Sequence, residues 1–322
     1  MGRAPQVKIA RIIGVSSLAL VVIGLWYFYP AVWLAILTCL PLMLVLILLH
    51  GERIDIFSGR RLGPWIAAKG NALAITGAFI IPGRLTELFK PIYFNQLRSI
   101  SLAEGLSIVM VERIYDIAAV MIMGMGALFL LPGSETGLLN FSKYFAVAGL
   151  LLFFGMLLLV LRYPAQCTRF LQVVPEGRVR NFMLSTFTAF RQSMMHGAGV
   201  WQIFLTLIVW TGSWLLYWIF LQWDGGADLA VRQALIVFLV GTLGLTITVT
   251  PGGLGTFEAA VTLVLRHYGY DLESAISSAL GLRVVALLPN ALLASYTIYA
   301  DGFDIMRARG LAKSVGASND IP

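Results

Sequence analysis

The sequence has few charged residues and very few cysteines for its length. Of its 322 residues only 12% are charged and 59% are hydrophobic, which lies outside the range of soluble globular proteins. Cys39 lies in an apolar run and Cys167 among basic residues, so no disulfide framework is implied. A glycine-rich nucleotide fingerprint, clustered Cys and His ligands and an HExxH motif are also lacking. We therefore expect an integral membrane protein without a metal or other cofactor.

Long apolar runs predict the membrane-spanning helices. Ile12 to Tyr29 and Val32 to Leu49 are joined at Pro30, and each approaches the roughly 20 residues that a bilayer crossing needs. No small-residue cleavage site follows the first run, so we expect a retained helix rather than a signal peptide. Four further spans are expected, at Ser101 to Leu131, Tyr144 to Leu161, Trp201 to Trp223 and Asp271 to Ala300.

Basic residues separate these runs and predict their orientation. Arg53, Arg60, Arg61 and Lys69 are assigned to a cytoplasmic segment after the second run, and more basic residues follow from Arg162 to Arg191 and after Ala300. By the positive-inside rule both chain ends are cytoplasmic. The net charge of +7 is therefore a topology signal, and we expect no nucleic-acid partner.

The basic segment also contains an apolar stripe at helical spacing. Met183, Phe187, Phe190 and Met194 fall on one face of an expected amphipathic helix. Two interpretations stay open. The helix lies on the lipid surface, where its positive face collects anionic lipid, or its apolar stripe packs on the helical bundle.

Two helix-breaking segments interrupt apolar runs. The first begins at Pro82 and contains Arg84 and Glu87, and the second runs from Pro251 to Glu258. Irregular backbone at membrane depth is tolerated only where protein or a wet cavity covers it. We interpret both as re-entrant hairpins, the first entering from the cytoplasm and the second from outside, although two full crossings remain an alternative.

The two halves of the sequence repeat this arrangement. Ser101 begins a capping box and Asp271 is a second expected helix cap, each shortly after a break. Arg113 lies 12 residues after Ser101, and Arg283 lies 12 residues after Asp271. With the predicted orientation this is an inverted repeat, an arrangement in which transporters hold substrate between discontinuous helices.

The candidate site residues are charged groups at membrane depth. Arg113 and Arg283 each lie about 18 Å along a helix, well inside a hydrocarbon core roughly 30 Å thick, and therefore need a partner or a cavity. Arg113 either pairs with Asp116, beside Glu112, or presents its guanidinium group to a phosphate. Arg283 has no acid within a turn, so its partner is across the bundle or is the ligand.

The breaks supply further candidates. Gly252, Gly253 and Gly255 allow a backbone to approach a ligand closely, and half-helix N-termini favour anions. Glu87 and Glu258 follow the breaks, where an acid either caps a helix or faces the cavity to bind an ammonium group or a proton.

These motifs carry a family resemblance. Pro82-x-Arg84-x-x-Glu87, Val111-Glu112-Arg113-x-x-Asp116 and Pro251-Gly-Gly-x-Gly-x-x-Glu258 resemble the flippase-like family typified by the transmembrane region of lysylphosphatidylglycerol synthase. The resemblance covers about Ala67 to Ala300. It implies a polytopic plasma-membrane protein that moves lipids between leaflets or acts in cell-envelope lipid pathways. The sequence departs from the family in lacking an aminoacyl-transferase domain and in having Leu85-Thr86 where a glycine usually precedes the glutamate.

We therefore predict an all-α polytopic membrane protein with about six spans and two re-entrant hairpins. The expected function is that of a lipid translocase, not an enzyme, with membrane lipids as partners and with homo-oligomerisation left open. The alternative is a proton-coupled secondary transporter of a small anion or lipid-linked precursor; an enzyme acting on a lipid carrier is disfavoured. A single transmembrane domain is expected over residues 1–322, with subdivisions 12–100, 101–200, 201–306 and 307–322.

Overall fold

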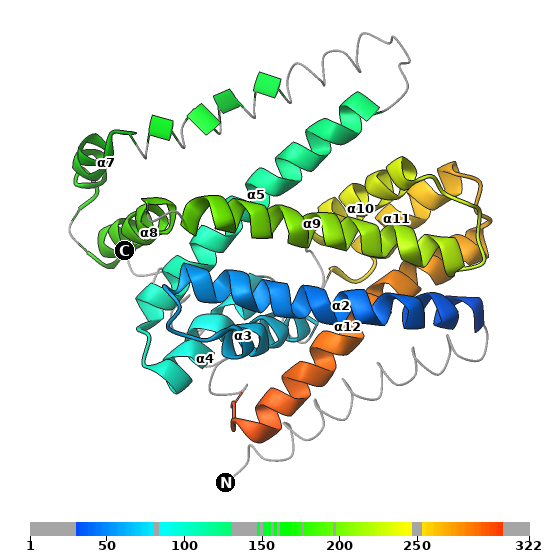
Figure 1. Ribbon diagram of the computed structural model, residues 1–322, viewed down its shortest axis with the longest axis horizontal. Coiled ribbons are helices and arrows are strands. Elements are labelled where there is room, and N and C mark those ends of the chain that lie inside the picture. The colour runs from blue at the N-terminus through cyan, green and yellow to red at the C-terminus, as the bar shows by residue number, and fades with distance from the viewer. Residues whose placement is uncertain are drawn as a thin grey trace. The chain divides into compact units, whose positions relative to one another are not determined.

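The computed structural model describes most of the chain as helices. The described residues are 30–79, 84–130, 147–148, 151–152, 154–155, 158–159, 162–175, 177–195, 198–246 and 253–304. Their elements, labelled in Figure 1, are α2 Pro30–Phe57, α3 Pro64–Gly77, the 3-10 helix η1 Arg84–Leu88, α4 Phe89–Arg98, α5 Leu102–Leu130, α7 Pro164–Leu171, α8 Arg178–Met195, α9 Ala198–Trp223, α10 Val231–Thr246, α11 Thr256–His267 and α12 Leu272–Ala300. The expected all-helical architecture is confirmed for these residues.

Three helices in the described ranges are long and apolar enough to cross a membrane. They are Pro30–Phe57, Gly199–Trp223 and Leu272–Ala300, and each coincides with a predicted span. Of the other three predicted spans, Ser101 to Leu131 forms the helix α5, which is not among these three, and Ile12 to Tyr29 and most of Tyr144 to Leu161 lie outside the described residues. The number of six spans therefore stays a prediction.

Side-chain caps fix the start of α5 and α12, the longest helices in the described ranges. The Ser101 hydroxyl accepts a hydrogen bond of 3.2 Å from the Glu104 amide, and Asp271 accepts one of 2.9 Å from the Ser274 amide. These bonds satisfy amides that have no partner inside the helix. α5 and α12 follow these caps, and each is 29 residues long. Both predicted helix starts are confirmed.

Two of the four basic residues assigned to the cytoplasmic segment, Arg53 and Lys69, are buried in helices, whereas the side chains of Arg60 and Arg61 are exposed. α2 continues past Leu49 to Phe57, and Arg53 is fully buried within it. Lys69 is buried in α3, where its ammonium group lies 3.0 Å from Asp301 and 5.1 Å from the Tyr296 ring centre. Both cations pair with acids inside the protein, and the predicted cytoplasmic side of this segment stays a prediction.

The chain forms two compact units. The terminal unit contains the described residues of 1–47, 69–90 and 213–322, and the central unit contains those of 48–68 and 91–212. The boundaries between units fall inside helices, so segments distant in sequence build each unit.

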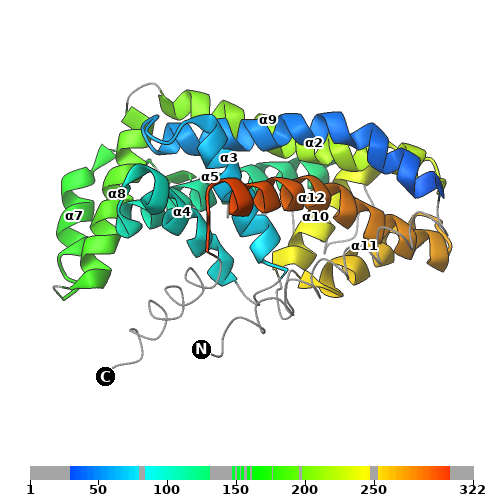
Figure 2. The ribbon, with the colours of Figure 1, turned by 90° about the horizontal axis from the view of Figure 1, so that it is seen from below.

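In the central unit, α8 packs on α5, as both ribbon views show (Figures 1 and 2). The Phe190 ring lies 6.2 Å from that of Tyr115, and the Ser185 and Ser107 hydroxyls are 2.9 Å apart. Phe190 is buried. Of the two interpretations of the apolar stripe, Phe190 therefore supports packing on the bundle.

Arg61 and Glu104 close the base of the first broken hairpin. Arg61 lies just before α3, Glu104 lies in the first turn of α5, and their side chains form an ion pair. α3 has 14 residues and is therefore about 21 Å long, shorter than a hydrocarbon core of roughly 30 Å. The ion pair brings together a residue before α3 and a residue after α4, and the re-entrant course of this segment stays a prediction.

In the terminal unit, α10 and α11 form the second broken hairpin, and α11 packs on α12. The backbone of Gly244 closely approaches Phe257, and that of Gly241 approaches Val261. As residue numbers fall along α10 they rise along α11, so the two helices are antiparallel. Gly253 and Gly255, before α11, have φ angles of +65° and +87°, a region that glycine adopts without steric cost.

Candidate functional site

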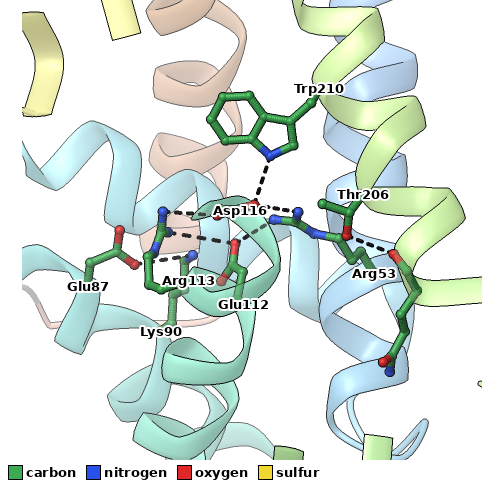
Figure 3. Close-up of polar contacts among 9 residues, drawn as sticks. Arg53, Glu87, Lys90, Glu112, Arg113, Asp116, Thr206 and Trp210 are labelled. Atoms are coloured by element: carbon green, nitrogen blue, oxygen red, sulfur yellow. Dashed lines mark hydrogen bonds and ion pairs between the residues drawn. The ribbon is translucent and has the colours of Figure 1, made fainter. Parts of the chain in front are cut away.

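Arg53 of α2 lies at the centre of a buried ion cluster in the central unit. Its Nη1 donates to Asp116 Oδ1 at 2.6 Å, and its Nη2 donates to Glu112 Oε1 at 3.1 Å. The Arg53 side chain is 0% exposed and that of Glu112 is 2% exposed. Figure 3 shows how the guanidinium group reaches from α2 to both α5 carboxylates.

Arg113 completes this cluster from α5. Its Nη1 donates to Asp116 Oδ2 at 3.2 Å, and its Nη2 lies 3.8 Å from Glu112 Oε1. The side chain of Arg113 is 35% exposed, whereas that of Asp116 is 11% exposed. We call Arg53, Glu112, Arg113 and Asp116 the α2–α5 ion cluster.

Trp210 of α9 fixes the remaining side of Asp116. Its indole N–H donates to Asp116 Oδ1 at 2.9 Å (Figure 3). Asp116 thus accepts hydrogen bonds from three helices, α2, α5 and α9. Such a fully bonded carboxylate is held in one orientation, with Oδ2 turned toward Arg113.

The predicted Arg113–Asp116 pair is confirmed, but sequence reasoning missed Arg53. It placed this residue in a loop because His50, Gly51 and Glu52 end the apolar run. A usable signal lay just beyond, since Ile54 and Phe57 continue the apolar pattern and are buried. A second signal was the excess of acid over base on α5, which required a cation from elsewhere.

A second buried ion pair lies at the break between α10 and α11, in the terminal unit. Arg283 of α12 forms an ion pair with Glu258, and its Nη2 also donates to Glu258 Oε2 and to the Gly253 carbonyl, both at 3.0 Å. The side chains of Arg283 and Glu258 are 8% and 15% exposed. The partner of Arg283 is thus across the bundle, one of the two predicted alternatives.

Glu258 also caps α11. Its Oε2 accepts a 2.8 Å hydrogen bond from the amide of Gly255. The predicted capping role is therefore confirmed, and the same carboxylate holds Arg283. One acid thus ties the start of α11 to the middle of α12.

Arg283 contacts residues beside both breaks. Its guanidinium carbon lies 4.8 Å from the ring centre of Phe257, just after the second break, and 5.3 Å from that of Phe79. Phe79 is the last described residue before the first break. One cation therefore contacts a described residue that precedes the first break and another that follows the second.

The first break contains another buried cation that sequence reasoning did not select. Lys90 is 1% exposed, and its ammonium group lies 3.3 Å from Glu87 Oε2. Glu87 thus pairs with a cation of the chain itself, and its predicted role toward a ligand stays a prediction. Pro82, Pro251 and Gly252 lie outside the described residues, as does the side chain of Arg84, whose backbone belongs to η1.

A comparison with models of known families identifies the family of the chain. The family model described as the lysylphosphatidylglycerol synthase TM region matches residues 9–294. The chain belongs to this family. Comparisons with curated proteins and with solved structures gave no match.

Membership confirms the resemblance drawn from the three motifs. It also supports a membrane-embedded, multi-pass protein that is associated with lipid metabolism or transport. The residues of the α2–α5 ion cluster and of the Arg283–Glu258 pair all lie within the matched range.

Proposed function

We propose that the protein is a lipid translocase, a flippase or scramblase that moves a polar or anionic lipid head group between leaflets. It acts in the plasma membrane, with both chain ends cytoplasmic. Six spans and two re-entrant hairpins form the pathway. The ion pair between Arg61 and Glu104, which closes the first hairpin, supports its re-entrant course.

The observation that carries the proposal is the α2–α5 ion cluster. Four charged side chains meet between two predominantly apolar helices, at a cost that insertion scales put at about 2.5–3.5 kcal/mol for a charge at the centre of a membrane helix. A purely structural helix contact needs no such groups. A lipid head group does, because a phosphate leaving water requires cationic donors along its path.

Arg113 and Arg283 are the proposed phosphate-binding groups. Each now donates to a carboxylate, so an incoming phosphate takes the place of that acid on the guanidinium group. The displaced acid, Asp116 or Glu258, then meets the cationic or hydroxyl part of the head group. Exchange of one anion for another keeps each arginine paired throughout translocation, which lowers the free-energy barrier to moving the head group.

No covalent step belongs to this proposal, and the protein is proposed not to be an enzyme. The alternative is a proton-coupled transporter of a small anion or lipid-linked precursor. Glu258 favours it, because this one carboxylate accepts hydrogen bonds from both Arg283 and the amide of Gly255, so a transported proton bound there would weaken both contacts. The alternative differs from a scramblase in requiring an ion gradient.

The test is exchange of fluorescent phospholipids between the leaflets of vesicles that contain the purified protein, without a gradient. Arg113→Ala and Arg283→Ala are expected to slow exchange about 10- to 100-fold, since a hydrogen bond to a charged group contributes about 1.5–3 kcal/mol. Arg60→Ala is the matched control, because Arg60 pairs with Glu52 on an exposed surface and its side chain is 61% exposed.

The proposal is supported if the native protein and the control variant exchange lipid between leaflets and both site variants lose this exchange. A native protein that exchanges lipid only under a proton gradient would favour the transporter. Unchanged exchange in both site variants would contradict the assigned phosphate-binding groups. Elution as a single folded species in size-exclusion chromatography is required of every variant.

A further inference from the structure

The α2–α5 ion cluster is electrically balanced. Arg53 and Arg113 supply two positive charges, and Glu112 and Asp116 supply two negative charges, so the four side chains sum to zero. Neutralising Arg53 lowers this net charge by one unit, and neutralising Asp116 raises it by one unit.

Because the cluster is buried, its net charge affects any ligand that binds beside it. The side chains of Arg53, Glu112 and Asp116 are 0%, 2% and 11% exposed, so little water screens their charges. Two unit charges interact several-fold more strongly near protein than in bulk water. An added unit of charge at this cluster is therefore felt by any head group that reaches Arg113.

Arg113 is the member that a head group reaches first, because its side chain is 35% exposed. A phosphate with no cationic partner would take Arg113 and leave Glu112 and Asp116 with Arg53 alone. A head group that carries both a phosphate and an ammonium group restores the balance, because the ammonium group can approach the carboxylate that Arg113 releases.

We propose that the formal charge of the α2–α5 ion cluster sets head-group selectivity, and that its zero sum selects zwitterionic head groups over anionic and cationic ones. Arg53 is the positioning residue of this device. Its planar guanidinium group holds both acids at once, at 2.6 and 3.1 Å, and has no exposed surface with which to touch lipid itself. The inference rests on the proposed lipid translocation.

The experiment measures exchange of three fluorescent lipids in the same vesicles: zwitterionic phosphatidylcholine, anionic phosphatidylglycerol and cationic ethyl-phosphatidylcholine. The variants are Arg53→Gln, Asp116→Asn and the charge-balanced double variant. Arg60→Gln is the matched control, since it removes one positive charge from an exposed pair in the same unit. Lipids retained by each purified protein are identified by native mass spectrometry as a second, transport-independent readout.

The native protein is expected to favour the zwitterionic lipid in both readouts. Arg53→Gln should shift the ratio toward the cationic lipid, and Asp116→Asn toward the anionic lipid, each by about fivefold or more given the weak screening of buried charges. The double variant should return toward the native ratio, and Arg60→Gln should leave it unchanged. A merely structural role for Arg53 would lower all three exchange rates together and leave their ratio intact.

The outcomes separate the two proposals. Exchange by the native protein with lipid ratios that no variant alters would overturn the selectivity inference and leave translocation standing. Absence of exchange for all three lipids would overturn translocation. In that case, the lipids that native mass spectrometry identifies on each purified variant show whether the cluster selects head groups. If Arg53→Gln does not fold, Asp116→Asn alone tests the predicted shift toward anionic lipid.

Discussion

At the scale of single residues, Arg53 and Arg283 share one environment. Each is buried on a long apolar helix, and each donates to a carboxylate on a neighbouring helix, Asp116 for Arg53 and Glu258 for Arg283. Removing one partner of such a pair leaves an uncompensated charge and typically costs about 3–5 kcal/mol. Variants at these positions therefore need a folding measurement beside every activity measurement.

Asp224 is a buried acid of a different kind. It follows α9, and it accepts hydrogen bonds of 2.6 Å from the Ser278 hydroxyl, 3.0 Å from the Gly226 amide and 3.3 Å from the Tyr270 hydroxyl. The Tyr270 hydroxyl also lies 3.1 Å from the Ala227 carbonyl, so its single proton serves two acceptors. Burial raises the pKa of Asp224 above its ordinary value of 3.8, although the hydrogen bonds oppose this rise.

This raised pKa predicts a pH dependence of stability. The neutral form of Asp224 is favoured in the folded state, so its contribution is fully present below pH 3.8 and is lost as pH rises through the raised pKa. Asp224→Asn, which mimics the neutral acid, should flatten this loss. Thermal unfolding of the protein in detergent between about pH 4 and 8 measures it.

Asp271→Asn is the matched control for this prediction. Hydrogen bonds from Ser274 lower the pKa of Asp271, so its contribution is present above pH 3.8 and is lost only as pH falls below that value. The control should keep the native slope over the measured range. An Asp224→Asn variant whose stability still falls with rising pH as in the native protein would contradict the assignment to Asp224.

At the scale of elements, close packing holds each broken hairpin together. A Cβ at Gly244 of α10 would lie 2.9 Å from the Thr256 carbonyl oxygen and 3.0 Å from Ala260, both on α11. A backbone atom cannot move aside as a flexible side chain can. The absence of a side chain at Gly244 is therefore a condition for the α10–α11 hairpin, which places Glu258 beside Arg283.

Gly244→Ala should therefore destabilise the protein by about 1–3 kcal/mol, the usual range for overpacking. Gly124→Ala on α5 is the comparison, because a Cβ there would meet no described atom within 4 Å. It should stabilise the helix by up to about 1 kcal/mol, since alanine is the better helix former. Midpoints of thermal or denaturant unfolding report both changes, and equal loss in the two variants would contradict the packing argument.

At the scale of the whole molecule, one pattern occurs twice. A helix, a break, a shorter helix and a capped helix of 29 residues follow one another in each half, and the long helices are α5 and α12. Arg113 and Arg283 occupy matching positions on them, and each pairs with an acid. The recurrence supports the predicted repeat, and its inverted orientation awaits a topology measurement.

Labelling of single cysteines from one side of the membrane provides that measurement for the first hairpin. In a Cys167→Ser background, where Cys39 is buried, Arg60→Cys places a thiol before α3 and Arg98→Cys places one at the end of α4. A re-entrant course predicts that an impermeant reagent labels both from the same side. A full crossing between them would expose the two thiols on opposite sides.

The sequence by itself determined the features that depend on neighbouring residues. The caps at Ser101 and Asp271, the pair Arg113–Asp116 and the cap formed by Glu258 all join groups three residues apart, so local spacing predicts them. The family motifs likewise follow from short stretches, and residues 9–294 match the family. Such contacts form within one turn and need no knowledge of packing.

Only the tertiary structure decided which distant charges meet. Arg53 and Asp116 are separated by 63 residues, and Lys69 and Asp301 by 232 residues. Basic residues near the end of an apolar run read as topology signals unless an acid from another helix compensates them, and that acid is chosen by helix packing. A buried charge in a low-dielectric interior must be compensated by a partner. Helix packing therefore places Arg53, which was predicted to lie between spans, at the centre of the α2–α5 ion cluster.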